Sequence, residues 1–192
     1  MGHGDVVTPT VLDRVARGLG ARLVLRLDWN GEGLARLLDE GHASIVEAVI
    51  RSLRAAGWEA LTEATFSIFG ERGSVDVLAW HAPTGALLVV EVKSVVADAQ
   101  DTLAALARKV RLAERIAPPA WHARAVSTLL VVADTRTNRR RVSSLDTTFA
   151  NAFPDRAATI RRFIAKPDAA IRGLWFLSSS TQATARHRVR RV

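Results

Sequence analysis

The stretch Ser74–Lys93 constrains the fold of this chain more than any other, because two apolar runs flank one short turn. The first run reads SVDVLAW, the second reads LLVVEVK, and HAPTGA separates them. Alternating side chains are typical of β-strands, so the pattern predicts a hairpin. Pro and Gly at the second and fourth positions of Ala82–Gly85 suit a type I turn. We therefore expect residue 80 opposite 87, 78 opposite 89 and 76 opposite 91.

This register predicts two carboxylates on neighbouring strands. Asp76 and Glu91 would have Cβ atoms about 5 Å apart, where like charges repel. A divalent cation reverses that effect, and hard cations such as Mg²⁺ prefer carboxylate oxygens and water. Lys93 lies on the same strand face as Glu91, where its ammonium could orient a water or stabilise charge on a phosphate. The alternative is a surface hairpin, but the apolar second run favours a strand covered on both faces.

Asp76, fourteen intervening residues and Glu91-Val92-Lys93 at the end of an apolar strand resemble the signature of the PD-(D/E)XK nuclease superfamily. The superfamily includes restriction-endonuclease-like and Holliday-junction-resolvase-like enzymes, and Val75 stands where a Pro usually precedes the Asp. The resemblance implies Asp76, Glu91 and Lys93 as catalytic residues. It also implies that Asp76, Glu91 and the carbonyl of Val92 hold Mg²⁺ or Mn²⁺.

The resemblance extends to two helical residues. Glu47, on the first core helix, matches a further metal ligand by position, although the helical wheel places it about 150° from the apolar stripe. A solvated Glu is the alternative. Lys109, on the second core helix, matches a basic side chain that contacts phosphate, and a solvated surface Lys is the alternative. His42 lies on the apolar stripe of the first helix, so we expect a core histidine and not a catalytic base.

The order of the predicted elements favours an α/β fold. Periodicity predicts helices over residues 33–56 and 98–116, with strands over 58–69, in the hairpin, and over 127–133. That αβββαβ order is similar to the core of the superfamily, a mixed sheet flanked by helices. Further helices are expected over 139–152 and 155–165, and a last strand over 173–178. These elements predict a nuclease-like domain over 32–178 and a basic tail over 179–192.

Residues 1–31 are expected to form a helix-strand appendage. An amphipathic helix is predicted over 8–20, where Thr8 and Pro9 suit its start, and an alternating strand over 21–29. The helix resembles the last helix of Cro/C1-type helix-turn-helix domains, whose preceding helices have no counterpart here. A generic helix is the alternative.

Composition narrows the choice of partner. The 192 residues carry a net charge of +8, and all but three of the 27 basic residues are Arg. This balance suits a polyanion such as DNA, although the coding bias of a GC-rich genome also raises the Arg count. Three arginines that follow the strand at 127–133 are the candidate DNA contacts: Arg136, Arg139 and Arg140.

The lack of Cys and the lack of a long apolar run exclude some kinds of site and limit the expected location. The chain has no Cys, so disulfides and thiolate metal sites are excluded. No apolar run approaches the roughly 20 residues of a membrane span, and the first residues do not resemble a signal peptide, so we expect a cytoplasmic protein without membrane contact.

The sequence therefore predicts a Mg²⁺-dependent DNA endonuclease that hydrolyses phosphodiester bonds. The alternative is a non-catalytic DNA-binding transcriptional regulator that retains the nuclease-like fold, and a structural or oligomerisation domain is a third reading. A homodimer is expected for cutting duplex DNA, because two strands need two sites.

Overall fold

The computed structural model describes residues 8–23 and 32–178, and the chain divides into two compact units, Met1–Ala35 and Arg36–Val192. In the first unit, α1 (Pro9–Gly18) lies where a helix was predicted, directly after Thr8. Of the strand expected over 21–29, residues 21–23 are not in a strand, and the others lie outside the described residues.

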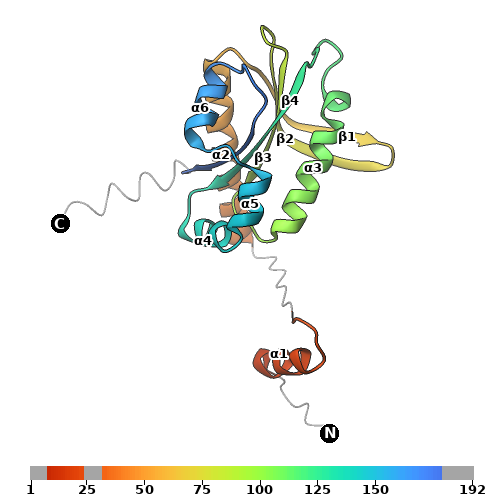
Figure 1. Cartoon of the computed structure of the whole chain (residues 1–192), viewed down its shortest axis with the longest axis vertical. Helices are drawn as coiled ribbons and strands as arrows, with labels where there is room; N and C mark the ends of the chain where they lie inside the picture. Colours follow the sequence, from red (N-terminus) through yellow and green to blue (C-terminus); the bar gives the residue numbers. More distant parts are fainter. Residues whose placement is uncertain (1–7, 24–31, 179–192) are drawn as a thin grey trace, which may run out of the picture. The chain divides into compact units, whose positions relative to one another are not determined.

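A five-stranded mixed sheet forms the centre of the second unit (Figure 1). The strands lie side by side in chain order: β1 (Glu59–Ile68), β2 (Glu71–His81), β3 (Ala86–Lys93), β4 (Ala125–Ala133) and β5 (Arg172–Leu177). Neighbours are antiparallel from β1 to β3 and parallel from β3 to β5. The predicted α/β class, with a mixed sheet flanked by helices, is confirmed.

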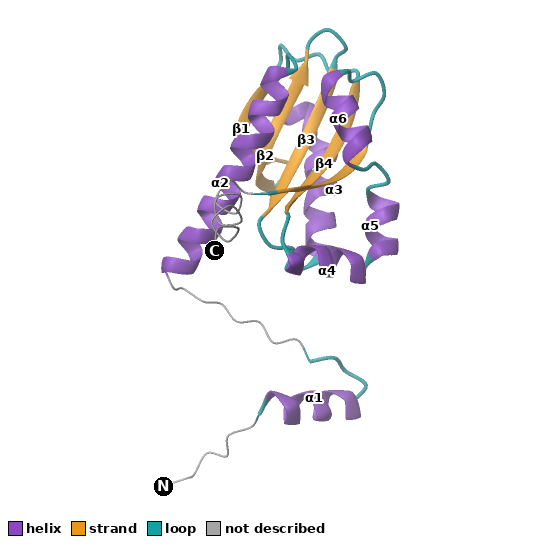
Figure 2. Cartoon of the chain, turned by 90° about the vertical axis from the view of Figure 1, so that its left-hand side faces the viewer, coloured by secondary structure: helices purple, strands orange, loops and turns teal. Residues whose placement is uncertain are grey.

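Helices cover both faces of the sheet (Figure 2). On one face α2 (Glu32–Ala55) and α6 (Ala157–Ala165) bury one apolar layer, and on the other face α3 (Ala99–Ile116) buries a second. The run at the end of β3 alternates between these layers, since Val90 and Val92 face α2 while Val89 faces α3. Glu91 therefore projects to the α3 side, at a position that an apolar residue would normally take.

The hairpin of β2 and β3 has the predicted register. Trp80 pairs with Leu87 and Leu78 with Val89, but the ladder ends at Val77, which pairs with Val90. The chain reverses over residues 82–85, as predicted. Residues 76 and 91 thus lie one position beyond the last pair, so the expected direct pairing of Asp76 with Glu91 is absent from the ladder.

The sheet divides at Asp76. Pairing between β1 and β2 stops at Thr62 and resumes at Ala64, which leaves Glu63 and Asp76 outside the ladder. Glu63 has a φ of 49°, an uncommon conformation for a residue other than Gly. Beyond this point the β1–β2 ribbon extends away from the other strands (Figure 1). Asp76 consequently lies where β2 leaves β3.

The C-terminal helices differ from the prediction in one respect. The helix expected over 139–152 begins earlier and is interrupted at Leu145, giving α4 (Arg136–Ser144) and α5 (Asp146–Ala152). The Thr135 hydroxyl accepts the N–H of Asn138 and caps the earlier start. The last strand, β5, is present, and the tail over 179–192 lies outside the described residues. Among the described helices, none combines the length and the apolar character that a membrane span requires.

Candidate functional site

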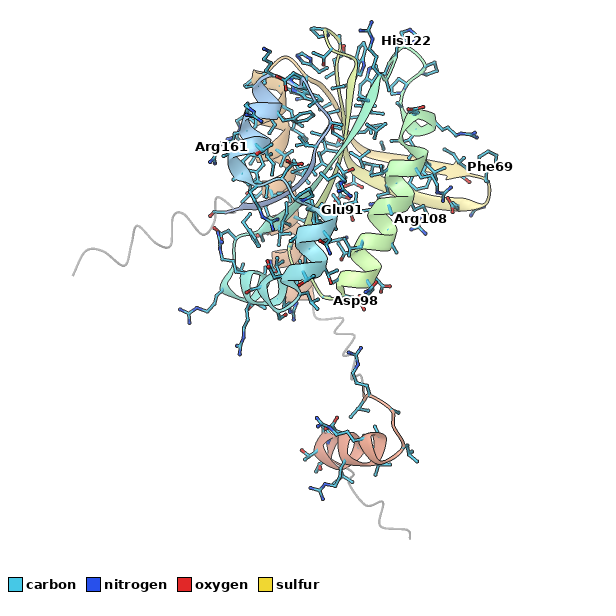
Figure 3. The ribbon with its side chains drawn as sticks, in the orientation of Figure 1. Phe69, Glu91, Asp98, Arg108, His122 and Arg161 are labelled. Atoms are coloured by element: carbon cyan, nitrogen blue, oxygen red, sulfur yellow. The ribbon has the colours of Figure 1, made fainter. Side chains whose placement is uncertain are left out.

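Glu91 is buried on β3 between two lysines. Its side chain is 2% exposed, the Nζ of Lys93 lies 2.7 Å from Oε1, and the Nζ of Lys109 bonds Oε2. Figure 3 places Glu91 in the interior of the second unit, beside α3. Buried charges persist only when they are paired and hydrogen-bonded, so these three residues form one electrostatic unit.

The placement of Lys109 corrects an expectation. It was predicted to contact DNA phosphate, with a solvated lysine as the alternative, but only 10% of its side chain is exposed. It shares the buried face of α3 with Leu106, Leu112 and Ala113. Lys109 is therefore not the solvated lysine of the alternative, and its ammonium pairs with Glu91 inside the molecule.

Asp76 is partly buried beside this unit. Its Oδ2 accepts the backbone N–H of Val92 at 2.6 Å, which ties β2 to β3 just beyond the ladder. Burial is the main cause that raises the pKa of Asp76, and the negative charge of Glu91 raises it further. The Val92 N–H, Lys109 and His42 oppose that shift only in part. A cation next to this carboxyl would stabilise its charged form.

Two further side chains reach Asp76 from other elements. His42 of α2, Glu63 of β1 and Asp76 each offer a ligand atom, and these atoms lie within 4.8 Å of one another. Carboxylate oxygens suit Mg²⁺ and Mn²⁺, and an imidazole nitrogen favours Mn²⁺ over Mg²⁺. His42 was expected to be a core histidine, but it is only partly buried, and its imidazole lies within reach of these two carboxylates.

Glu63 was missed at the sequence level. With Asp76 and Glu91 it makes a row of three acids on three adjacent strands. The sequence shows Glu63 only as an acid within the strand predicted over 58–69, and the observed register then places it beside Asp76, because Thr62 pairs with Val77.

Glu47 lies apart from the other predicted metal ligands. Its side chain is 73% exposed and is paired with Arg51 at 2.7 Å, one turn further along α2. The α2 residue that lies near Asp76 is instead His42, five positions earlier. The outward direction of Glu47 agrees with the helical wheel and not with the position that the resemblance implies.

The four charges around Glu91 sum to zero without a metal ion. Two carboxylates, Asp76 and Glu91, face two ammonium groups, Lys93 and Lys109. A divalent cation therefore competes with the lysines for these acids unless Glu63 adds its charge or a phosphate attracts a lysine.

The predicted DNA contacts lie on α4, after the end of β4. Arg139 donates to both carboxylate oxygens of Asp134, at 2.5 and 3.0 Å, and its guanidinium lies 4.6 Å from the centre of the Phe176 ring. Arg136 and Arg140 are exposed. These arginines form a separate cluster from the lysines around Glu91.

Asn138 connects the two clusters. It is 1% exposed, its Oδ1 accepts the N–H of Val96, and its Nδ2 donates to the carbonyls of Ser94 and Ala133, both at 2.9 Å. One buried amide thus joins the loop after Lys93 to the end of β4.

A comparison with protein-family profiles, curated proteins and solved structures gives no match. Function is therefore argued from the chemistry of the site.

Proposed function

We propose that this chain is a metal-dependent DNA nuclease of the PD-(D/E)XK type. The observation that carries the proposal is the row of acids Glu63, Asp76 and Glu91, with Lys93 beside it, at the point where β2 leaves β3. The element order from α2 to β4 also follows the αβββαβ core to which the sequence is similar. A protein that only binds a phosphate backbone gains nothing from acids gathered beside it.

The side chains around Asp76 fit a divalent cation. His42, Glu63 and Asp76 have ligand atoms within mutual reach. Burial raises the pKa of Asp76 more than any other cause, and a bound cation would favour its charged form. Glu91 and the Val92 carbonyl remain the ligands that the resemblance adds. Bound there, Mg²⁺ or Mn²⁺ would polarise the phosphodiester as a Lewis acid.

Lys93 and Lys109 take different roles in this proposal. Lys93 is about one-third exposed while it bonds Glu91, and an ammonium has three donors. It can therefore donate to a water or a phosphate oxygen without leaving Glu91. Lys109 is buried and holds Glu91 in position from α3, so it is a positioning residue.

The proposal is tested by incubating purified protein with supercoiled plasmid and with branched DNA in Mg²⁺ or Mn²⁺. We expect metal-dependent cleavage, and a loss of at least about 100-fold for Asp76→Asn, Glu91→Ala and Lys93→Ala. Circular dichroism checks that each variant is folded. Glu47→Ala is the matched control, because it removes an exposed carboxylate from α2 and should leave cleavage unchanged.

Cleavage that survives both Glu91→Ala and Lys93→Ala would remove the assignment. Calorimetric titration with Mn²⁺ supplies a readout that does not depend on cleavage. His42→Ala should bind Mn²⁺ about tenfold more weakly than the parent chain, whereas Glu47→Ala should bind it equally well.

A DNA-binding regulator that retains a nuclease-like fold is the second candidate. It is favoured by one observation, that both oxygens of Glu91 are already engaged by lysines in a charge-balanced set. Salt-sensitive DNA binding without any cleavage in Mg²⁺ or Mn²⁺ would select this candidate.

A further inference from the structure

The β1–β2 ribbon beyond Asp76 has one packed face and one open face. Four of its apolar side chains pack in the layer that α3 covers: Ala64, Phe66, Ile68 and Val75. A Cβ at Gly73 would meet the Phe66 ring, so Gly73 lies on the packed face as well. Side chains alternate along a strand, so the residues between these project from the opposite side of the ribbon.

The open face is polar along its whole length. Its four side chains are paired across the ribbon by the register, Thr65 with Ser74 and Ser67 with Arg72. At its base stand Glu63 and Asp76, and the Ser74 Oγ donates to Oε2 of Glu63 at 3.0 Å. The open face therefore runs without a break from two acids of the candidate site toward the tip of the ribbon.

Two contacts with α3 support the end of the ribbon. The Nη2 of Arg111 donates to both carboxylate oxygens of Glu71, each at 2.8 Å. The guanidinium of Arg115 lies 4.6 Å from the centre of the Phe69 ring, and Figure 3 places Phe69 at the tip. The ribbon thus presents its open face from a position that α3 fixes from behind.

Arg72 differs from these two arginines because it is uncommitted. It is exposed, and within the part of the chain that the structure describes it has no acidic partner. The hydroxyls of Thr65 and Ser67 are likewise exposed and have no partner among the described residues. Arginine and hydroxyl side chains are donors that proteins use to contact phosphate oxygens of DNA. The open face therefore carries a set of free donors next to the candidate site.

The length of the open face suits several nucleotides of one DNA strand. Arg72 precedes Asp76 by four residues, which is about 13 Å at about 3.3 Å per strand residue. Each nucleotide of a DNA strand rises about 3.4 Å along the helix, so this length matches about four nucleotides. A two-stranded ribbon is also narrow enough to enter the major groove of a duplex.

We propose that the open face of the ribbon binds the phosphate backbone of the DNA beside the cut, with Arg72 on a phosphate about four nucleotides from the scissile one. The inference deepens the proposed function, on which it rests for the identity of the polyanion. It makes the ribbon the arm that guides the strand toward Asp76.

The first test measures binding without cleavage. A fluorescein-labelled duplex is titrated with the full chain in EDTA at several salt concentrations, and fluorescence anisotropy gives the dissociation constant. Arg72→Ala should bind at least about threefold more weakly and lower the slope of log K against log salt by about 0.9, the value for one lost phosphate contact. The matched control is Arg108→Ala, which removes the same charge from α3 (Figure 3) and should leave the affinity and the slope unchanged.

The second test locates the DNA on the ribbon. The chain has no Cys, so Ser67→Cys and Ala104→Cys each introduce a single thiol, the first on the open face and the second at an exposed position of α3. The reaction of each thiol with a neutral maleimide is timed in EDTA with and without saturating duplex. We expect the Ser67→Cys thiol to lose most of its reaction rate when DNA is bound, and the Ala104→Cys thiol to keep its rate.

Equal loss of affinity in Arg72→Ala and Arg108→Ala would overturn the proposal, because binding would then follow net charge alone. An unprotected thiol in Ser67→Cys while DNA is bound would overturn it as well, whatever the result of the cleavage assay. A parent chain that binds no duplex would overturn it together with the proposed function. Since EDTA removes divalent metal, a chain that binds DNA through the ribbon and never cuts it would contradict the proposed nuclease alone.

Discussion

At the scale of single residues, Glu91 is the shared counter-ion of Lys93 and Lys109. Removing its charge would leave Lys109 buried without its hydrogen-bonded counter-ion, and breaking a buried pair in this way costs about 3–5 kcal/mol. We expect Glu91→Gln to lower the free energy of unfolding by that amount, as measured by urea denaturation. Glu91→Gln/Lys109→Met should recover part of the loss, because the unpaired charge is removed as well.

The matched comparison is Glu47→Gln, which breaks the exposed pair with Arg51. Exposed pairs contribute about 0–1 kcal/mol, so this variant should unfold almost as the parent chain does. Losses of similar size in both variants would show that Glu91 is not a buried counter-ion.

Asp76 gives the chain a characteristic pH dependence. Its raised pKa means that the folded state binds this proton more tightly than the unfolded state does. The resulting stability is present below the ordinary pKa of an Asp and is lost as the pH rises through the raised value. Asp76→Asn does not titrate and keeps an acceptor for the Val92 N–H.

We therefore expect Asp76→Asn to gain stability relative to the parent chain as the pH rises above the ordinary pKa of an Asp, as measured by urea midpoints in the absence of divalent metal. Asp168→Asn, at an exposed position, is the control. If the difference in urea midpoint between Asp76→Asn and the parent chain became smaller as the pH rises, burial of Asp76 could not be the cause of its raised pKa.

At the scale of helices and strands, periodic features could be predicted from the sequence. The hairpin register followed from the length of its turn, which fixes Trp80 opposite Leu87. The long helix α2 followed from its apolar stripe and from Gly57, whose φ of 83° ends it.

The site itself could be predicted only in part. The division of the sheet depends on the backbone of Glu63, whose positive φ has no signal in the amino-acid type. Lys109 lies three residues after Leu106 and four before Ala113, so the helical wheel already placed it on the buried face. Its charge favoured a surface position, and the buried partner across the layer, Glu91, belongs to a distant segment.

Asn138, on α4, joins the end of β4 to the loop after β3. Asn138→Ala removes three side-chain hydrogen bonds and takes away the Oδ1 acceptor of the buried Val96 N–H, which costs about 1–3 kcal/mol. We expect a lower urea midpoint and faster hydrogen exchange at the Val96 amide. Asn151→Ala, at an exposed position on α5, should change neither, and unaltered exchange at Val96 in Asn138→Ala would contradict this role.

At the scale of the whole molecule, the net charge of +8 has a local meaning. The lysines Lys93 and Lys109 are committed to Glu91, and Arg139 to Asp134. Exposed arginines such as Arg136 and Arg140 are therefore left to attract a polyanion. The charge is thus available for the proposed association with DNA, while the proposed chemistry would depend on a nearly neutral set of buried groups.

The number of sites per molecule sets the form of the product. Within the described residues, one chain has one row of acids at the end of β3, so it should cut one strand at each encounter. We expect supercoiled plasmid to become nicked circles first, and linear DNA to appear later with a steeper dependence on protein concentration. A gel time course, together with sedimentation at the same concentrations, measures both. Linear DNA as the first product from a monomer would contradict a single site, whereas linear DNA as the first product from a dimer would support the expected homodimer, because two chains together supply the second site.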